Sequence, residues 1–266
     1  MSTQFTPSHR GGSGDPLLLV HGFTDTWRSW ELVLPYLERD FDVLAPTLAG
    51  HAGGPELPAS ADEEVLVDGV EAAMDAAGFD TAHVVGNSLG GFVSLQLAER
   101  GRARSVVALA PAGGWEGAGG LTDGLADYFV TLRQMVLAAV PHIDAIVSTP
   151  EGRRQATQLI VENFEHIPPE LIAHQIRGVA ACAESERMVE LGRQIGWRLD
   201  PERIDCPVRF VWGTEDRILP WPSAAERFRS RLFPDADWVV LDGVGHCPQL
   251  DVPLETAELV RGFAGS

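Results

Sequence analysis

The segment Gly86-Asn87-Ser88-Leu89-Gly90-Gly91 combines a serine with glycines at the spacing Gly-x-Ser-x-Gly. It directly follows the short apolar run 83–85 and precedes a stretch with helical spacing. Between a strand and a helix, this spacing predicts a sharp, strained turn that lifts the serine hydroxyl above the sheet edge. The segment therefore predicts nucleophilic catalysis by Ser88. The alternative is an ordinary glycine-rich turn between a strand and a helix.

A serine nucleophile needs a general base, and the base needs an acceptor that fixes its tautomer. Of the eight histidines, only His246 follows the last apolar run of the chain, 238–241, and we predict that it is the base. Asp216 follows the apolar run 208–212, and we predict that it orients His246. The carboxyl ends of strands are where α/β sheets hold their sites. Glu215 and Asp242 are the alternatives for the acid.

Acyl transfer through a serine also requires two donors that stabilise the oxyanion of the tetrahedral intermediate. We predict that one is the backbone amide of Leu89, which begins the helix after Ser88. The second is expected in the loop after the first apolar run, and the Phe23 amide is the candidate. We expect His21 to order this loop by hydrogen bonds and to take no part in proton transfer.

These residues need a sheet to position them, and the chain alternates short apolar runs with helical patterns. The runs are rich in β-branched residues and bounded by Gly, Pro, Asp or Asn, which is typical of buried parallel strands. They are 17–20, 41–44, 83–85, 105–109, 208–212 and 238–241. Helical spacing covers 61–77, 89–100, 224–232 and 254–263. This alternation predicts an α/β fold with a mostly parallel, doubly wound sheet.

The alternation stops between residues 114 and 200, where apolar residues recur at helical steps without a strand signal. One helical pattern contains Leu121, Leu125, Phe129, Leu132 and Val136, and others cover 153–164 and 170–193. The length of this stretch predicts an inserted helical cap or lid. The predicted domains are a core of residues 1–113 and 201–266 and a cap of residues 114–200. The alternative is an outer helix layer of the same sheet.

The chain resembles the α/β-hydrolase family in segments that occur in the family order. These segments are 21–23, 46–51, 86–91, 213–220 and 243–246. The resemblance implies a Ser88, Asp216 and His246 triad beneath a helical lid, with no cofactor and no metal. The family usually begins with an antiparallel hairpin, and the short segment before residue 17 implies that one opening strand is missing or very short. Ser88 argues against the dehalogenase and epoxide hydrolase branch, whose nucleophile is Asp.

The substrate is expected to be a small or medium apolar ester, hydrolysed through an acyl-enzyme on Ser88 as in carboxylesterases. Besides Phe23 and Leu89, candidate pocket residues, which ordinary core packing explains equally well, are Trp27, Trp115, Tyr128, Phe129, Leu132 and Ile218. The alternative is hydrolysis of a carbon–carbon bond, because Gly-Asn-Ser-x-Gly-Gly resembles ring-cleavage-product hydrolases. Arg177 or Arg187 would then bind the substrate carboxylate. Lactonase, perhydrolase and lyase variants of the same machinery, and a binding protein without chemistry, are further alternatives.

Composition excludes several other classes. All 20 basic residues are arginine, so Schiff-base lysine chemistry and phosphate-loop lysines are absent. The net charge of −18 disfavours nucleic acid and anionic membranes as partners. Three cysteines provide no disulfide framework, and the polar N-terminal segment lacks a signal-peptide pattern, so we expect a cytoplasmic protein with a small-molecule substrate and no membrane span. The oligomeric state is left open.

Overall fold

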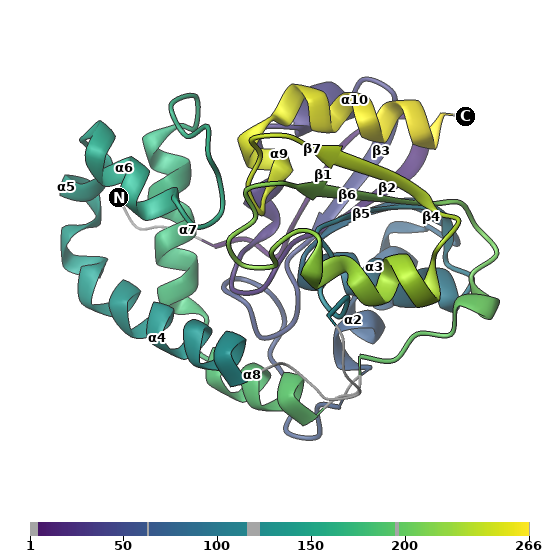
Figure 1. Cartoon of the computed structure of the whole chain (residues 1–266), viewed down its shortest axis with the longest axis horizontal. Coiled ribbons are helices and arrows are strands. Elements are labelled where there is room, and N and C mark those ends of the chain that lie inside the picture. The colour runs from purple at the N-terminus through teal and green to yellow at the C-terminus, as the bar shows by residue number, and fades with distance from the viewer. Residues whose placement is uncertain (1–4, 63, 116–122, 195–196, 266) are drawn as a thin grey trace.

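The described residues of the computed structural model, 5–62, 64–115, 123–194 and 197–265, form one α/β body around a seven-stranded sheet (Figure 1). The strand order is β1-β3-β2-β4-β5-β6-β7. Strand β1 pairs with β3 in the antiparallel direction, and the other pairs are parallel. The strands are β1 (Ser8–Gly12), β2 (Asp15–Val20), β3 (Phe41–Pro46), β4 (Ala82–Asn87), β5 (Ala103–Leu109), β6 (Val208–Gly213) and β7 (Asp237–Leu241). The predicted fold class is confirmed.

Each predicted apolar run lies within one of the strands β2 to β7, and the central strands are buried on both faces, which explains their near-continuous apolar sequences. Strand β1 was not predicted. Its sequence, Ser-His-Arg-Gly-Gly, is polar, and its residues are exposed or half-buried at the edge of the sheet. One opening strand therefore precedes β2, in place of a hairpin.

Helices cover both faces of the sheet, as a doubly wound fold requires. One face packs against η1 (Trp27–Trp30), α1 (Leu34–Leu37) and α10 (Pro253–Ala264), with α9 (Pro248–Asp251) beside them. The other packs against α2 (Val65–Ala77) and α3 (Leu89–Glu99) and against Phe228. The predicted helix 224–232 is two short pieces, η4 (Ser223–Ala225) and the π-helical turn η5 (Phe228–Leu232).

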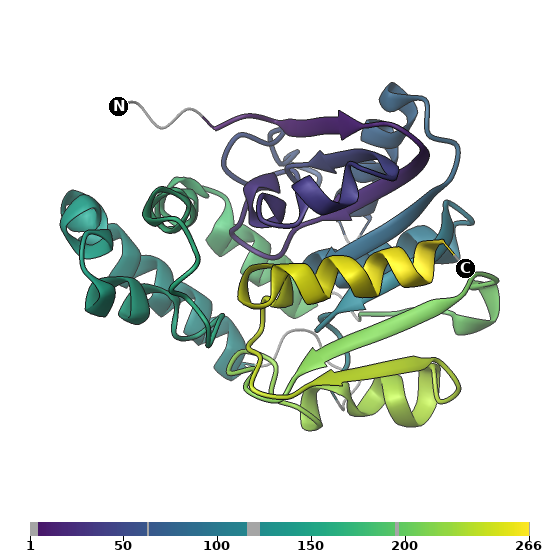
Figure 2. The same cartoon turned by 90° about the horizontal axis from the view of Figure 1, so that it is seen from above.

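The described residues between β5 and β6 contain helices and no strand, and residues 123–194 lie beyond one end of the sheet (Figures 1 and 2). We call α4 to α8 the helical insertion. Its elements are α4 (Asp123–Ala139), η2 (Val140–His142), α5 (Ile143–Val147), α6 (Pro150–Thr157), α7 (Pro169–Ala181) and α8 (Ser185–Gln194), and η3 (Pro201–Arg203) precedes β6. The run predicted over 170–193 is two helices, and that over 153–164 ends at Thr157. Leu121 lies outside the described residues, and the domain boundaries stay a prediction.

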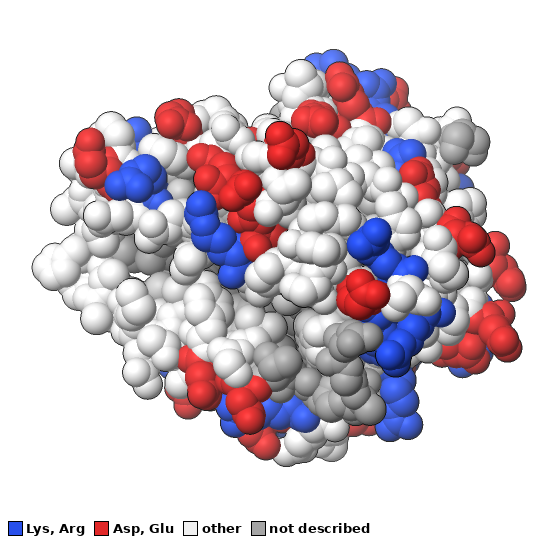
Figure 3. All heavy atoms as spheres, viewed as in Figure 1, with Lys and Arg blue, Asp and Glu red and all other residues white. Residues whose placement is uncertain are grey.

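Helix α4 has two different sides. It packs on α7 and α8, while Met135 and Leu137 are exposed, and the area around α4 in Figure 3 is largely free of charge. By length and composition alone, the stretch Asp123–Val147 would be able to cross a membrane. The expectation that the chain has no membrane span therefore stays a prediction.

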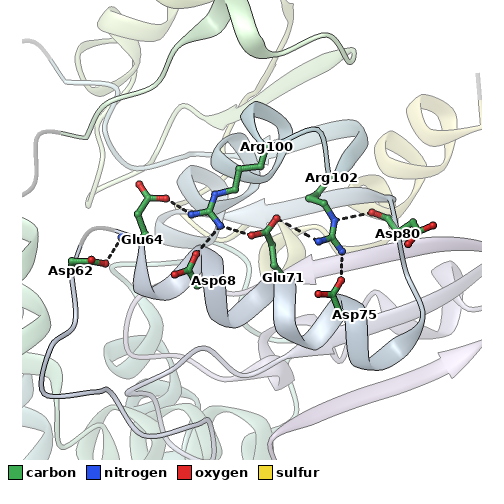
Figure 4. Close-up of polar contacts among 8 residues, drawn as sticks. All are labelled: Asp62, Glu64, Asp68, Glu71, Asp75, Asp80, Arg100 and Arg102. Atoms are coloured by element: carbon green, nitrogen blue, oxygen red, sulfur yellow. Dashed lines mark hydrogen bonds and ion pairs between the residues drawn. The ribbon is translucent and has the colours of Figure 1, made fainter.

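Ion pairs along α2 fix the far end of helix α3, whose first turn follows Ser88 (Figure 4). Arg100, the C-cap residue of α3, pairs with Asp68 at 2.8 Å and also with Glu64 and Glu71. Arg102 pairs with Asp75 at 2.6 Å and donates to the Asp80 carbonyl. The four acidic residues occur at helical spacing, so one face of α2 holds both arginines.

Candidate active site

Ser88 occupies the strained turn between β4 and α3 that its motif predicts. Its backbone has φ 54° and ψ −117°, in the left-handed half of φ space that side chains rarely adopt. A Cβ on Gly86 would lie 2.1 Å from the Gly90 carbonyl oxygen, and one on Gly90 would lie 2.1 Å from the Val20 carbonyl oxygen. Only glycine permits strand and helix to approach this closely, so these two residues allow the turn that carries Ser88.

His246 and Asp216 are paired in the interior, beside the carboxyl ends of β7 and β6. His246 Nδ1 and Asp216 Oδ2 are 2.7 Å apart, and the Asp216 side chain is fully buried. Asp216 Oδ1 accepts the amide N–H groups of Ile218 and Leu219 at 2.9 and 2.7 Å, which hold the carboxylate in place. The two alternative acids, Glu215 and Asp242, are exposed. The geometry thus favours Asp216 as the partner of His246.

Two backbone amides flank Ser88 without hydrogen bonds to any described residue, those of Phe23 and Leu89. Leu89 is the first residue of α3, where an N–H has no partner within the helix. Phe23 lies in the loop after β2 and lines the same cleft as Ser88. Both amides are therefore available to an oxyanion, as an acyl-transfer site requires.

His21 holds the Phe23 loop against the loop that follows β3. Its Nε2 accepts the Leu48 N–H at 2.9 Å, and Nδ1 lies 2.7 Å from the Gly22 carbonyl oxygen. Complete burial lowers the pKa of His21 well below its ordinary value, and the neighbouring His51 acts in the same direction. His21 is therefore neutral, with both ring nitrogens occupied, as expected for a residue that orders the loop.

Asn87, next to the nucleophile, joins the strand end to the His246 loop. Its Nδ2 donates to the carbonyls of Leu109 and His246, at 3.1 and 3.0 Å. Its Oδ1 accepts from Gln249 Nε2 at 3.1 Å and from the Cys247 thiol at 3.4 Å. Burial raises the pKa of that thiol well above its ordinary value, so Cys247 is a neutral hydrogen-bond donor.

Asp251 connects the His246 loop to the helical insertion. It is 1% exposed, and its carboxylate accepts four hydrogen bonds. Oδ2 accepts from Gly245 N at 2.6 Å and Glu162 N at 2.9 Å, whereas Oδ1 accepts from the backbone N and Nδ2 of Asn163, both at 2.7 Å. Sequence reasoning missed both Asn87 and Asp251 as site residues, because their partners are distant in the chain.

A cleft between the sheet and the helical insertion opens on Ser88 and has two arms. Phe23, Ser88, Phe129 and Ile218 line both. The apolar arm is further lined by Leu57, Val65, Leu66, Leu89, Ala112, Trp115, Leu125, Met188, Val189, Leu191, Trp197 and Leu219, with Asp62 as its one charged described residue. The His246 arm is further lined by Asp25, Asn87, Tyr128, Leu132, Val136, Thr157, Ile160, Gln175, Ile176, His246 and Cys247, among others.

The cleft brings together all but one of the predicted pocket residues. Trp115 lines the apolar arm, Tyr128 and Leu132 the His246 arm, and Phe129 and Ile218 both. Trp27 is the exception and requires a correction. It packs on the core beneath the sheet, stacks on His9 and donates from Nε1 to Thr6 Oγ1 at 2.8 Å. Trp27 is not among the described residues that line either arm, although Phe23, earlier in the same loop region, lines both.

Cationic side chains are absent from the described walls of both arms. Arg177 pairs with Asp144 at 2.6 Å. Arg187 donates to the backbone carbonyls of Leu57, Pro58 and Ala59 and lies outside the cleft. Within the described part of the chain, no group of three or more His, Cys, Asp or Glu residues has the arrangement of a metal site.

The mostly parallel sheet, the strained serine turn at a strand end and the His–Asp pair beside it define a protein of the hydrolase class. Residues 17–259 match the model of the alpha/beta hydrolase family, and the chain belongs to that family.

Among its relatives, the chain is 32% identical over 201 residues to epoxide hydrolase EphH of Mycobacterium tuberculosis. This match covers 75% of this chain and 93% of the relative. It is 28% identical over 272 residues to pimeloyl-[acyl-carrier protein] methyl ester esterase of Aromatoleum aromaticum. This match covers 92% of this chain and 96% of the relative. The solved 2-hydroxy-6-oxo-6-phenylhexa-2,4-dienoate hydrolase of Rhodococcus has a TM-score of 0.74 at 22% identity, covering 99% of this chain and 98% of that one.

Proposed function

We propose that the protein hydrolyses carboxylic esters with an apolar acyl group through an acyl-enzyme on Ser88. The observation that carries this proposal is the buried pair of His246 and Asp216, of which His246 lines the same arm of the cleft as Ser88. A hydroxyl nucleophile and an imidazole whose second nitrogen is fixed by a carboxylate are the parts that acyl transfer needs.

In the proposed reaction, Ser88 Oγ attacks the ester carbonyl carbon while His246 Nε2 takes the hydroxyl proton. The amides of Phe23 and Leu89 donate to the oxyanion, and Asp216 stabilises the imidazolium. When the intermediate collapses, His246 gives its proton to the leaving alkoxide. A water molecule, deprotonated by His246, then attacks the carbonyl carbon of the acyl-enzyme. When this second intermediate collapses, His246 returns the proton to Ser88 Oγ and the acid is released. No hydrogen bond joins the side chains of Ser88 and His246 in this structure, so the proposed reaction requires the bound substrate to complete their alignment.

Two other reactions are less well supported. A ring-cleavage product carries a carboxylate, and neither described arm offers it a cation. Attack of Ser88 on an epoxide would form an alkyl ether, which has no carbonyl carbon for water to attack, so the enzyme would not turn over. The resemblance to an epoxide hydrolase is therefore one of family and fold.

The experiment is a panel of p-nitrophenyl esters of increasing acyl length, tested beside a ring-cleavage-product diketo acid, a lactone and an epoxide. We expect ester hydrolysis that is lost in Ser88→Ala. Asp216→Asn should lower kcat by orders of magnitude because control of the imidazole tautomer is lost, while Asp242→Asn, a matched change at an exposed position, should have little effect. Activity confined to the diketo acid or the epoxide would refute the proposal.

A further inference from the structure

The position of His246 assigns the two arms of the cleft to the two halves of an ester. His246 lines only one arm, and a general acid must lie beside the leaving oxygen that it protonates. If the proposed function holds, the leaving alcohol occupies the His246 arm, and the acyl group occupies the apolar arm on the other side of Ser88.

The His246 arm carries polar side chains that the proposed reaction does not use. Asp25 follows the Phe23 loop, and its Oδ1 accepts the Thr26 N–H at 2.8 Å. Gln175 comes from α7 and is 9% exposed, and its Nε2 makes no hydrogen bond of normal geometry with any described residue. The Gln175 amide lies close enough to the Asp25 carboxyl group to lower its pKa, so the two side chains face one another. A buried donor without a hydrogen bond of normal geometry can also donate to a ligand atom.

The chemistry of these two groups restricts what they bind. Burial raises the pKa of Asp25 to about 7, against the opposing effects of the Thr26 N–H and the Gln175 amide. Near neutral pH the carboxyl group therefore both donates and accepts hydrogen bonds, and Gln175 adds a donor. A hydroxyl group, itself donor and acceptor, satisfies both. An alkyl group satisfies neither, and a carboxylate would face the negative charge of ionised Asp25.

We propose that the His246 arm binds a leaving alcohol with a second, free hydroxyl, which Asp25 and Gln175 recognise. The substrates are then monoesters of diols or polyols with an apolar acyl chain. Asp25 and Gln175 determine specificity in this proposal and take no part in bond breaking.

The test compares two esters of equal size, 2-hydroxyethyl butanoate and n-propyl butanoate. In the wild-type protein, kcat/KM should be about tenfold or more higher for the hydroxyethyl ester, because the propyl ester leaves the polar groups unpaired. Gln175→Met keeps the side-chain volume and removes the amide, so it should lower this ratio severalfold by slowing the hydroxyethyl ester alone. Gln158→Met, the same change at an exposed position outside the arm, should preserve the ratio.

A second variant keeps the test informative if Gln175→Met fails to fold. Asp25→Asn keeps an oxygen for the Thr26 N–H and should also lower the ratio. Equal kcat/KM for both esters in the wild-type protein, or a ratio unchanged in both variants, would overturn the inference and leave the proposed function intact. Hydrolysis of neither ester, nor of p-nitrophenyl esters, would refute the proposed function and this inference with it.

Discussion

Replacement of Asp251 by Asn tests the most concentrated set of hydrogen bonds around the site. The carboxylate accepts four N–H groups, two on each oxygen, and is 1% exposed. An Asn side chain has one acceptor oxygen, so two of the four donors would face an NH2 group whichever way the amide is turned. At ~1.5–3 kcal/mol for a hydrogen bond to a charged group, two lost bonds cost about 3 kcal/mol or more.

The assay is equilibrium unfolding in urea at pH 7, with Asp242→Asn as the exposed control. We expect the free energy of unfolding to fall by at least about 3 kcal/mol in Asp251→Asn and by less than ~0.5 kcal/mol in the control. Because Gly245 N–H is one of the donors, kcat should also fall under conditions where the variant remains folded. A loss below about 1 kcal/mol would refute the reasoning, since it would mean that the donors find other acceptors.

Three further predictions concern the turn, pH and salt. Gly86→Ala should destabilise the protein by ~3 kcal/mol or more in urea unfolding, because its Cβ would lie 2.1 Å from the Gly90 oxygen, while Gly69→Ala, with open space in α2, should stabilise it by ~0.5–1 kcal/mol. An equal effect at both sites would contradict this. Burial lowers the pKa of His51 from 6.5 to about 4, so between these pH values only the unfolded chain binds its proton and stability rises with pH. In His51→Asn the increase from pH 4 to 6.5 should be smaller by about 3 kcal/mol, as measured by unfolding at both pH values, and an unchanged slope would contradict the assignment. Arg100→Gln should lower stability by ~1–2 kcal/mol at low salt and by less in 1 M NaCl, because its ion pairs are partly exposed to screening. A loss of stability that is the same at both salt concentrations would indicate that Arg100 stabilises the protein by packing and not by its ion pairs.

The strands and the serine turn were predictable because their signals are local. Apolar runs bounded by turn residues predicted β2 to β7. The glycines around Ser88 predicted the turn, because Gly86 and Gly90 approach one another within a few residues of the chain. Strand β1 has no such pattern, since its polar sequence lies at an edge and depends on its pairing with β3. Likewise, no proline or glycine marks the end of α7, where Cys182 is buried and donates to the Gly50 carbonyl.

The polar contacts around the site were not predictable, because they join residues far apart in the chain. Asn87 accepts a hydrogen bond from Gln249, and Asp251 accepts hydrogen bonds from residues of the helical insertion. These partners are so far apart in the chain that no pattern in a single sequence links them. Trp27 shows the opposite error. Its apolar ring made it a candidate for the pocket, whereas in the fold it packs, half-buried, against the hydrophobic core.

The central claim is that Ser88 is the nucleophile, and labelling with a fluorophosphonate followed by peptide mass spectrometry tests it most directly. We expect one adduct per chain, on the peptide that contains Ser88, with loss of ester hydrolysis in proportion to labelling and no adduct in Ser88→Ala. An adduct on another residue that abolishes activity, or undiminished ester hydrolysis in Ser88→Ala, would contradict it.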